Sequence, residues 1–186
     1  MDEGMAVAAA ALIAVVAQSF FLMLEARRGR LERAMVRQAS ARLVRDVISA
    51  RLEATHASLV SGRWWPDQLE ADGEIALEDR RALAGSADAE ALRRAFGSLR
   101  RFGQLRRSRA ARSSDELSED ELVEVAAVFF DLGLARRLLS PYTGYGTAPF
   151  ARPVDIAPAI QRRALAAAGI DSADGLYRRA TTPAPA

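Results

Sequence analysis

The chain has 186 residues, of which 27% are charged, and its formal net charge at pH 7 is +2. It contains no cysteine and a single histidine, which excludes disulfides and thiolate metal sites and leaves a metal ion only oxygen ligands. The overall charge gives no argument for nucleic acid binding, so the distribution of charge is more informative. Every basic residue other than the histidine is arginine, and asparagine is absent, which indicates the GC-rich coding bias of a bacterial gene.

The segment Met5–Leu24, MAVAAAALIAVVAQSFFLML, contains no charged residue. A helix of about 20 residues spans about 30 Å, the thickness of a bilayer hydrocarbon core, so the segment is predicted to be a transmembrane helix. Its strongly apolar side chains favour insertion by about 3 to 5 kcal/mol. The anchoring side chains in this prediction are Val7, Leu12, Ile13, Val16, Phe20, Phe21 and Leu22.

Two other interpretations of this segment are less favoured. A cleaved signal peptide carries positive charge before its apolar run, whereas Asp2 and Glu3 precede this one. A buried helix of a globular domain normally has a polar stripe, and here only Gln18 and Ser19 interrupt the apolar residues. Ala6, Ala10 and Ala14 recur every four residues, a spacing of small side chains that favours transmembrane dimerisation but also arises easily in an alanine-rich chain.

The charges that flank the segment predict its orientation. Arg27, Arg28 and Arg30 follow it closely, and no arginine precedes it. The positive-inside rule then places residues 1–4 outside and the rest of the chain in the cytoplasm, as a single-pass signal-anchor protein of the bacterial inner membrane. The same three arginines are near enough to the bilayer to contact anionic lipid headgroups, although topology is their better-supported role.

Residues 25–60 are predicted to form a juxtamembrane amphipathic helix that continues the membrane helix and packs on a helical cytoplasmic domain, residues 61–169. Its apolar residues recur at three- and four-residue steps. These residues are Leu31, Met35, Leu43, Val44, Val47, Ile48, Leu52 and Leu59. Helices of the domain are expected over Ile75–Leu83, from Ser86 or Asp88 through Leu105, over Glu119–Leu139 and over Ala157–Ala168. The fold class is therefore all-α, and residues 170–186 are expected to form a flexible tail.

Short-range signals set the predicted helix ends. Ser118 and Glu121 have the spacing of a capping box, and Pro141 is expected to end that helix. Asp155 is expected to cap the last helix, and Gly169 to terminate it.

The strongest charge feature is Arg93–Arg112, within which no acidic residue occurs. Its arginines have three interpretations. They pair with the acids of Asp115–Glu124, they bind an acidic protein or a membrane surface, or they bind nucleic acid phosphates. The first is the simplest, because opposite charges lie on consecutive elements. The candidates for a partner surface are Arg100, Arg101, Arg106 and Arg107, together with Tyr142 and Tyr145 from a loop rich in glycine, proline and aromatic residues.

No catalytic constellation, cofactor motif or metal-ligand spacing is visible, and His56 lies alone in a helical segment. The predicted function is therefore non-enzymatic: a membrane-tethered interaction or scaffold module that contacts the lipid bilayer and a protein partner, or a second copy of itself. The alternative is a membrane-anchored regulator that binds nucleic acid through Arg93–Arg112.

Overall fold

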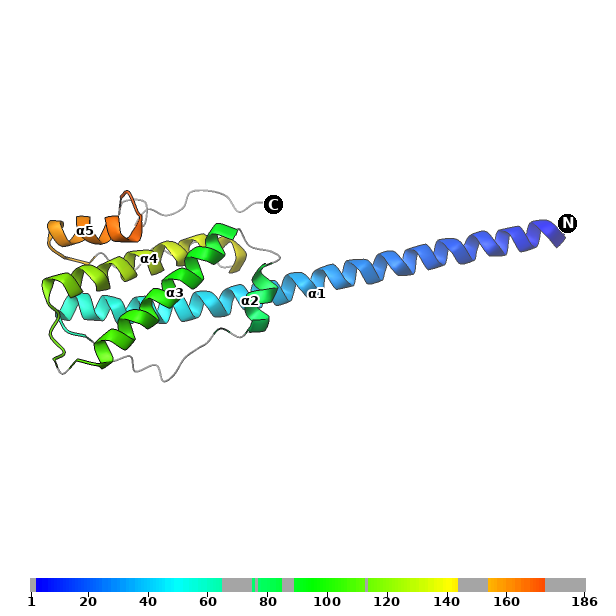
Figure 1. Ribbon diagram of the computed structural model, residues 1–186. Coiled ribbons are helices and arrows are strands. Elements are labelled where there is room, and N and C mark those ends of the chain that lie inside the picture. The colour runs from blue at the N-terminus through cyan, green and yellow to red at the C-terminus, as the bar shows by residue number, and fades with distance from the viewer. Residues whose placement is uncertain are drawn as a thin grey trace. The chain divides into compact units, whose positions relative to one another are not determined.

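The computed structural model describes residues 3–64, 75, 77–84, 89–112, 114–143 and 154–172. All elements of this part are helices, which confirms the prediction of an all-α protein. They are α1 (Glu3–Ser61), α2 (Leu77–Ala84), α3 (Ala89–Ala110), α4 (Glu119–Thr143) and α5 (Pro158–Ala168) (Figure 1). The chain divides into two units, Met1–Arg37 and Gln38–Ala186, and α1 contributes to both.

In the first unit, α1 exposes its large apolar side chains to solvent wherever those side chains are described. Phe20 is 57% exposed and Phe21 is 67% exposed. The others are Val15, Leu22, Met23, Leu24, Leu31, Met35 and Val36. Arginines follow this apolar stretch, and Arg28 pairs with Glu32 one helical turn later at 3.0 Å.

Within the part of the chain that the structure describes, no helix is both long enough and apolar enough to cross a membrane. The helix α1 covers the predicted anchor, but the side chains of residues 3–14, 16 and 17 are not described. Val7, Leu12, Ile13 and Val16 are among them.

In the second unit, α1 buries one face. Ala41, Val44, Ile48, Leu52 and Leu59 follow each other at three-, four- and seven-residue steps and are all at most 6% exposed. This is the spacing of a single helical stripe, so one face of α1 packs in the core of the second unit from Ala41 to Leu59. α1 then ends at Ser61, and Gly62 takes the left-handed conformation with φ 66°.

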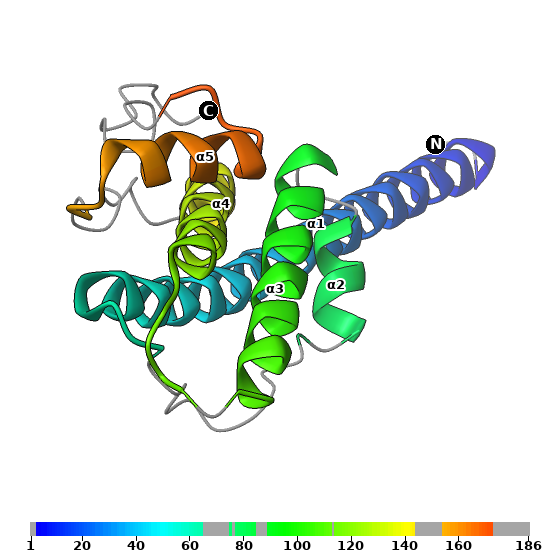
Figure 2. The same ribbon diagram turned by 60° about the vertical axis from the view of Figure 1, so that its left-hand side comes forward.

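α4 is the central helix of the second unit. It lies between this part of α1 and α5, with α3 alongside (Figure 2). The run from Val125 to Gly133 is buried without interruption, including Phe129 and Phe130. A helix that is apolar on all sides requires neighbours on all sides, and α1, α3 and α5 supply them.

Two predicted helix ends are wrong, and one is confirmed. α4 continues through Pro141 to Thr143, because a proline in the last turn removes only one hydrogen bond there and the Arg42 Nε donates to the Thr143 carbonyl at 2.7 Å. Asp155 does not cap α5, which begins at Pro158 after Ala157 and has no side-chain cap. Gly169 ends α5 as predicted, with φ 64° and its N–H bonded to the Ala166 carbonyl at 3.0 Å.

Candidate functional site

The arginine cluster of α3 is divided among different surroundings. A helix turns about 100° per residue, so arginines that follow each other in sequence lie on different faces. Arg109 and Arg112 contact the start of α4, Arg94 and Arg101 contact the middle of α4 and the end of α5, and Arg100, Arg106 and Arg107 line a groove on the side of α1.

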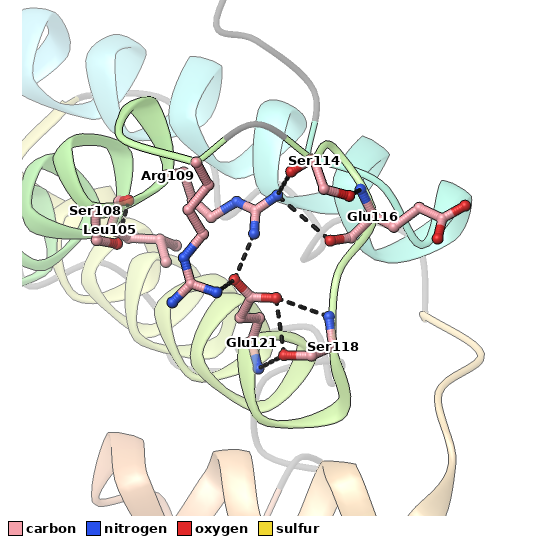
Figure 3. A network of polar contacts seen from close by, with 8 residues as sticks. Leu105, Ser108, Arg109, Ser114, Glu116, Ser118 and Glu121 are labelled. Atoms are coloured by element: carbon pink, nitrogen blue, oxygen red, sulfur yellow. Dashed lines mark hydrogen bonds and ion pairs between the residues drawn. The ribbon is translucent and has the colours of Figure 1, made fainter.

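The first group forms a buried ion-pair network with Glu121 (Figure 3). The side chains of Arg109 and Glu121 are 3% and 9% exposed, and the Arg109 Nη1 bonds the Glu121 Oε1. The Arg112 Nη1 reaches the same oxygen at 2.5 Å. The Arg109 Nη2 donates to the Ser114 carbonyl at 2.7 Å, so this guanidinium also fixes the connection between α3 and α4.

Glu121 also completes the predicted capping box at the start of α4. Its Oε2 accepts from the Ser118 backbone N–H at 2.8 Å, and its own N–H donates to the Ser118 hydroxyl oxygen at 3.4 Å. The hydrogen bond from the Ser118 N–H is the largest cause that lowers the pKa of Glu121, to about 2, and the Ser118 hydroxyl and the Arg109 guanidinium lower it further against the effect of burial. Glu121 is therefore charged at neutral pH and serves the fold.

The second group holds α5 against α4. Asp131, whose side chain is 5% exposed, lies 2.8 Å from the Arg94 Nε and 3.7 Å from the Arg101 Nη1. Arg94 also donates to the Ala168 carbonyl at 2.9 Å, at the end of α5. Cations at a helix C-terminus satisfy carbonyls that lack a partner within the helix. These two arginines are thus engaged in internal contacts.

The acids in the first turn of α4 contact α5. Arg163 reaches Glu119 at 2.9 Å and Asp120 at 2.6 Å. The hydrogen bond to Asp120 is the first cause that raises the pKa of Arg163. The predicted pairing of the Arg93–Arg112 cluster with the following acids is therefore confirmed for Arg109 and Arg112, both with Glu121.

The third group lines a groove between α1 and α3 with a volume of about 730 Å³. Residues from α1 and α2 add two arginines to it. The arginines of the groove are Arg51, Arg80, Arg100, Arg106 and Arg107, and none of the described lining residues is acidic. These five arginines and the apolar residues between them are called the arginine groove below.

Two of these arginines lie over aromatic rings of α3. The Arg51 guanidinium carbon is 5.1 Å from the centroid of the Phe102 ring, and that of Arg80 is 5.5 Å from the Phe96 ring. The Arg80 Nε also donates to the Ile75 carbonyl at 3.1 Å. Such stacking fixes the orientation of a guanidinium plane.

The other predicted surface residues have mixed outcomes. Arg101 does not line the arginine groove with Arg100, Arg106 and Arg107, because it faces Asp131. Tyr142 is half-buried in the last turn of α4 and packs against the core. Tyr145 lies outside the described residues.

In the first unit, Arg27, Arg28 and Arg30 are exposed. The Arg30 Nε donates to the Ala26 carbonyl of its own helix at 3.3 Å. Their predicted roles in topology and lipid contact remain predictions.

Sequence reasoning missed Arg51, Arg80 and Asp131. Asp131 carried a usable signal, since a single carboxylate within the apolar run of a central helix requires a cationic partner. Arg51 and Arg80 carried none, because their place in the groove depends on which faces of α1, α2 and α3 meet.

Among the described residues, no group of three or more His, Cys, Asp or Glu side chains is placed to hold a metal ion. His56 is half-buried, and its ring centroid is 6.0 Å from that of Phe129. Comparisons of the chain with protein-family models, with curated proteins and with solved structures found no match.

Proposed function

We propose that this protein is a non-enzymatic interaction module that residues 5–24 of α1 tether to a bacterial inner membrane, with the second unit in the cytoplasm. The observation that carries the proposal is the exposed apolar stretch of α1, from Val15 and Phe20 to Leu24, followed directly by arginines. Contiguous exposed apolar side chains indicate a membrane or a partner surface. The absence of charge from Met5 to Leu24 favours the membrane.

Tethering supports an interaction role because it raises the effective concentration of a module near other membrane proteins without adding contacts. In the second unit, three of the buried ionisable groups, Glu121, Arg109 and Asp131, are engaged in structural contacts. The arginine groove takes no part in these contacts, and its lining of arginine and apolar side chains is suited to binding a protein. The groove therefore supports the proposal that the tethered module binds a protein partner.

Fractionation of cells that produce the full chain tests the tether. The wild-type protein is expected in the membrane fraction and to resist an alkaline wash. Val15→Arg places a charge near the centre of the segment and costs about 3 kcal/mol, which is most of the predicted insertion free energy, so this variant is expected in the soluble fraction. Leu31→Arg is the matched control, because Leu31 is equally exposed but lies beyond the segment. Wild-type protein in the soluble fraction would overturn the proposal.

Single cysteines test the orientation, since the chain has none of its own. A membrane-impermeant maleimide is expected to label Asp2→Cys from outside intact spheroplasts and to leave Gln104→Cys unlabelled until the membrane is permeabilised. The reverse pattern would contradict the proposed topology.

Cross-linking in intact cells tests the interaction. The full chain, tagged at its C-terminus and recovered from the membrane fraction, is expected to carry a discrete protein partner or a second copy of itself. Recovery of nucleic acid instead would favour the alternative, a membrane-anchored nucleic acid-binding regulator.

A further inference from the structure

We infer that the arginine groove binds an acidic segment of a partner protein, one that carries apolar side chains between its carboxylates. The inference rests on the proposed function only in taking the partner to be a protein. It follows from the charge of the groove, the apolar surface beneath that charge and the fixed position of two of its guanidinium groups.

The charge of the groove is uncompensated at its edge. Arg100 and Arg107 are exposed, and neither forms an ion pair or hydrogen bond within the described part of the chain. Arg94 and Arg109 of the same helix differ in this respect, because each has a carboxylate within contact distance. Arg100 and Arg107, on one concave surface, attract a ligand with more than one carboxylate, because each guanidinium matches a carboxylate through paired hydrogen bonds.

The surface between the arginines is apolar. Val47 from α1 and Leu99 from α3 line the groove, together with the ring of Phe96. Leu99 is only half-buried, so a ligand can cover it further. A volume of about 730 Å³ accommodates a few side chains and lies within the usual range of ligand pockets, about 300 to 1,000 Å³. The occupant therefore combines negative charge with apolar side chains.

A peptide fits these features better than a nucleic acid. Single-stranded nucleic acids stack their bases on exposed aromatic rings. Phe102 is only 3% exposed, and the Arg51 and Arg80 guanidinium groups lie over Phe102 and Phe96. Nucleic acid strands bind along a positively charged groove that follows their backbone, whereas Arg94 and Arg101 do not extend this groove, because Asp131 engages them on another side of α3. A peptide that carries both carboxylates and leucines matches a groove lined by both arginines and apolar side chains.

Fluorescence anisotropy on the full chain in phosphatidylcholine nanodiscs tests the inference. The probes are a panel of labelled synthetic peptides of about 12 residues in which glutamates alternate with leucines and phenylalanines at helical and extended spacings. The same peptides with glutamine in place of glutamate, and labelled single-stranded DNA, are the comparison probes. At least one glutamate peptide is expected to bind, more weakly as salt rises, and its glutamine counterpart is not.

Substitutions locate the binding. Arg100→Gln together with Arg107→Gln is expected to weaken peptide binding by at least about 10-fold, because a hydrogen bond to a charged group is lost at each position. The matched control is Arg93→Gln with Arg162→Gln, which removes the same charge from exposed positions outside the groove. Circular dichroism confirms that both double variants fold like the wild type.

Three results would overturn the inference: no glutamate peptide binds, both double variants lose affinity equally, or DNA binds more tightly than every peptide and depends on Arg100 and Arg107. The proposed function fails separately. A chain that fractionates with the membrane and cross-links to a partner regardless of Arg100 and Arg107 would keep the proposed function while removing the inference.

Discussion

Arg107 and Arg109 lie two residues apart on α3, and their surroundings are opposite. Arg109 is buried and bonded to Glu121, whereas Arg107 is exposed at the edge of the arginine groove. A two-residue step on a helix rotates a side chain by about 200°, so the two guanidinium groups face different neighbours. A run of like charges in a sequence is therefore not one surface, because the role of each arginine is decided by the face of the helix that it occupies.

The largest effect is expected from Glu121→Gln. Glutamine preserves the acceptor that the capping box needs, but it leaves the buried Arg109 guanidinium without its countercharge, which costs about 3 kcal/mol. Chemical unfolding of the full chain in detergent, followed by tryptophan fluorescence, measures the loss, since one of the two tryptophans, Trp64, has its ring centroid 6.4 Å from that of Phe102. Glu124→Gln is the control, being exposed on the same helix. Equal losses for the two variants would show that the buried pair has no special role.

A somewhat smaller loss of unfolding free energy, about 2 kcal/mol, is expected for Asp131→Asn, because Arg94 retains its hydrogen bond to the Ala168 carbonyl. Amide hydrogen exchange should also quicken in α5, which these arginines hold against α4. Asp155→Asn, at an exposed carboxylate that caps nothing, serves as the comparison. If the amides of α5 exchange no faster in Asp131→Asn than in the wild type, the ion pairs of Asp131 do not hold α5 against α4.

Acidification should remove the contribution of Glu121 gradually. The folded-state pKa of Glu121 is lowered to about 2, and an unfolded glutamate has a pKa of about 4.3. The unfolded chain therefore takes up the proton first, and the stabilisation present above pH 4.3 is lost as the pH falls toward 2. The difference in unfolding free energy between wild type and Glu121→Gln should shrink across this interval. A difference that stays constant from neutral pH to pH 2 would mean that the charge of Glu121 is not what stabilises the fold.

The smallest effect is expected for Arg163→Gln. Arg163 pairs with Glu119 and Asp120, but all three side chains are exposed, with 51% of the Arg163 side chain accessible. Exposed ion pairs are screened by water and salt, so no resolvable change in the unfolding midpoint is expected. A loss comparable to that of Asp131→Asn would show that the number of ion pairs, and not their burial, determines stability.

Local signals predicted much of the fold. The capping box of Ser118 and Glu121 and the termination at Gly169 depend on residues within one turn, so the sequence alone identifies them. The prediction that Asp155 caps the last helix is wrong, because α5 begins at Pro158, whose nitrogen carries no hydrogen that a cap would have to bind. Ala157 therefore stands at the cap position, two residues after Asp155. The prediction that Pro141 ends its helix is wrong, because the side chains of Gln38 and Arg42, distant in the sequence, donate hydrogen bonds to the Thr143 carbonyl in the last turn of α4.

The candidate site was only half predictable. Arg100, Arg106 and Arg107 stand out as charges in the sequence, but the separation of Arg101 from them depends on the position of Asp131 in α4. Arg51 lies 49 residues before Arg100, and nothing local indicates that α1 and α3 form one groove. Contacts between helices distant in sequence are set by core packing, which periodicity alone does not specify.

The most direct test of the division compares the unfolding free energies of Arg109→Gln and Arg107→Gln in the full chain under identical detergent conditions. We expect Arg109→Gln to lose about 3 kcal/mol, because it leaves the buried Glu121 with the half-exposed Arg112 as its cationic partner. Arg107→Gln is expected to change the unfolding free energy by no more than about 0.5 kcal/mol. Equal losses for the two variants, or no loss for Arg109→Gln, would contradict the division.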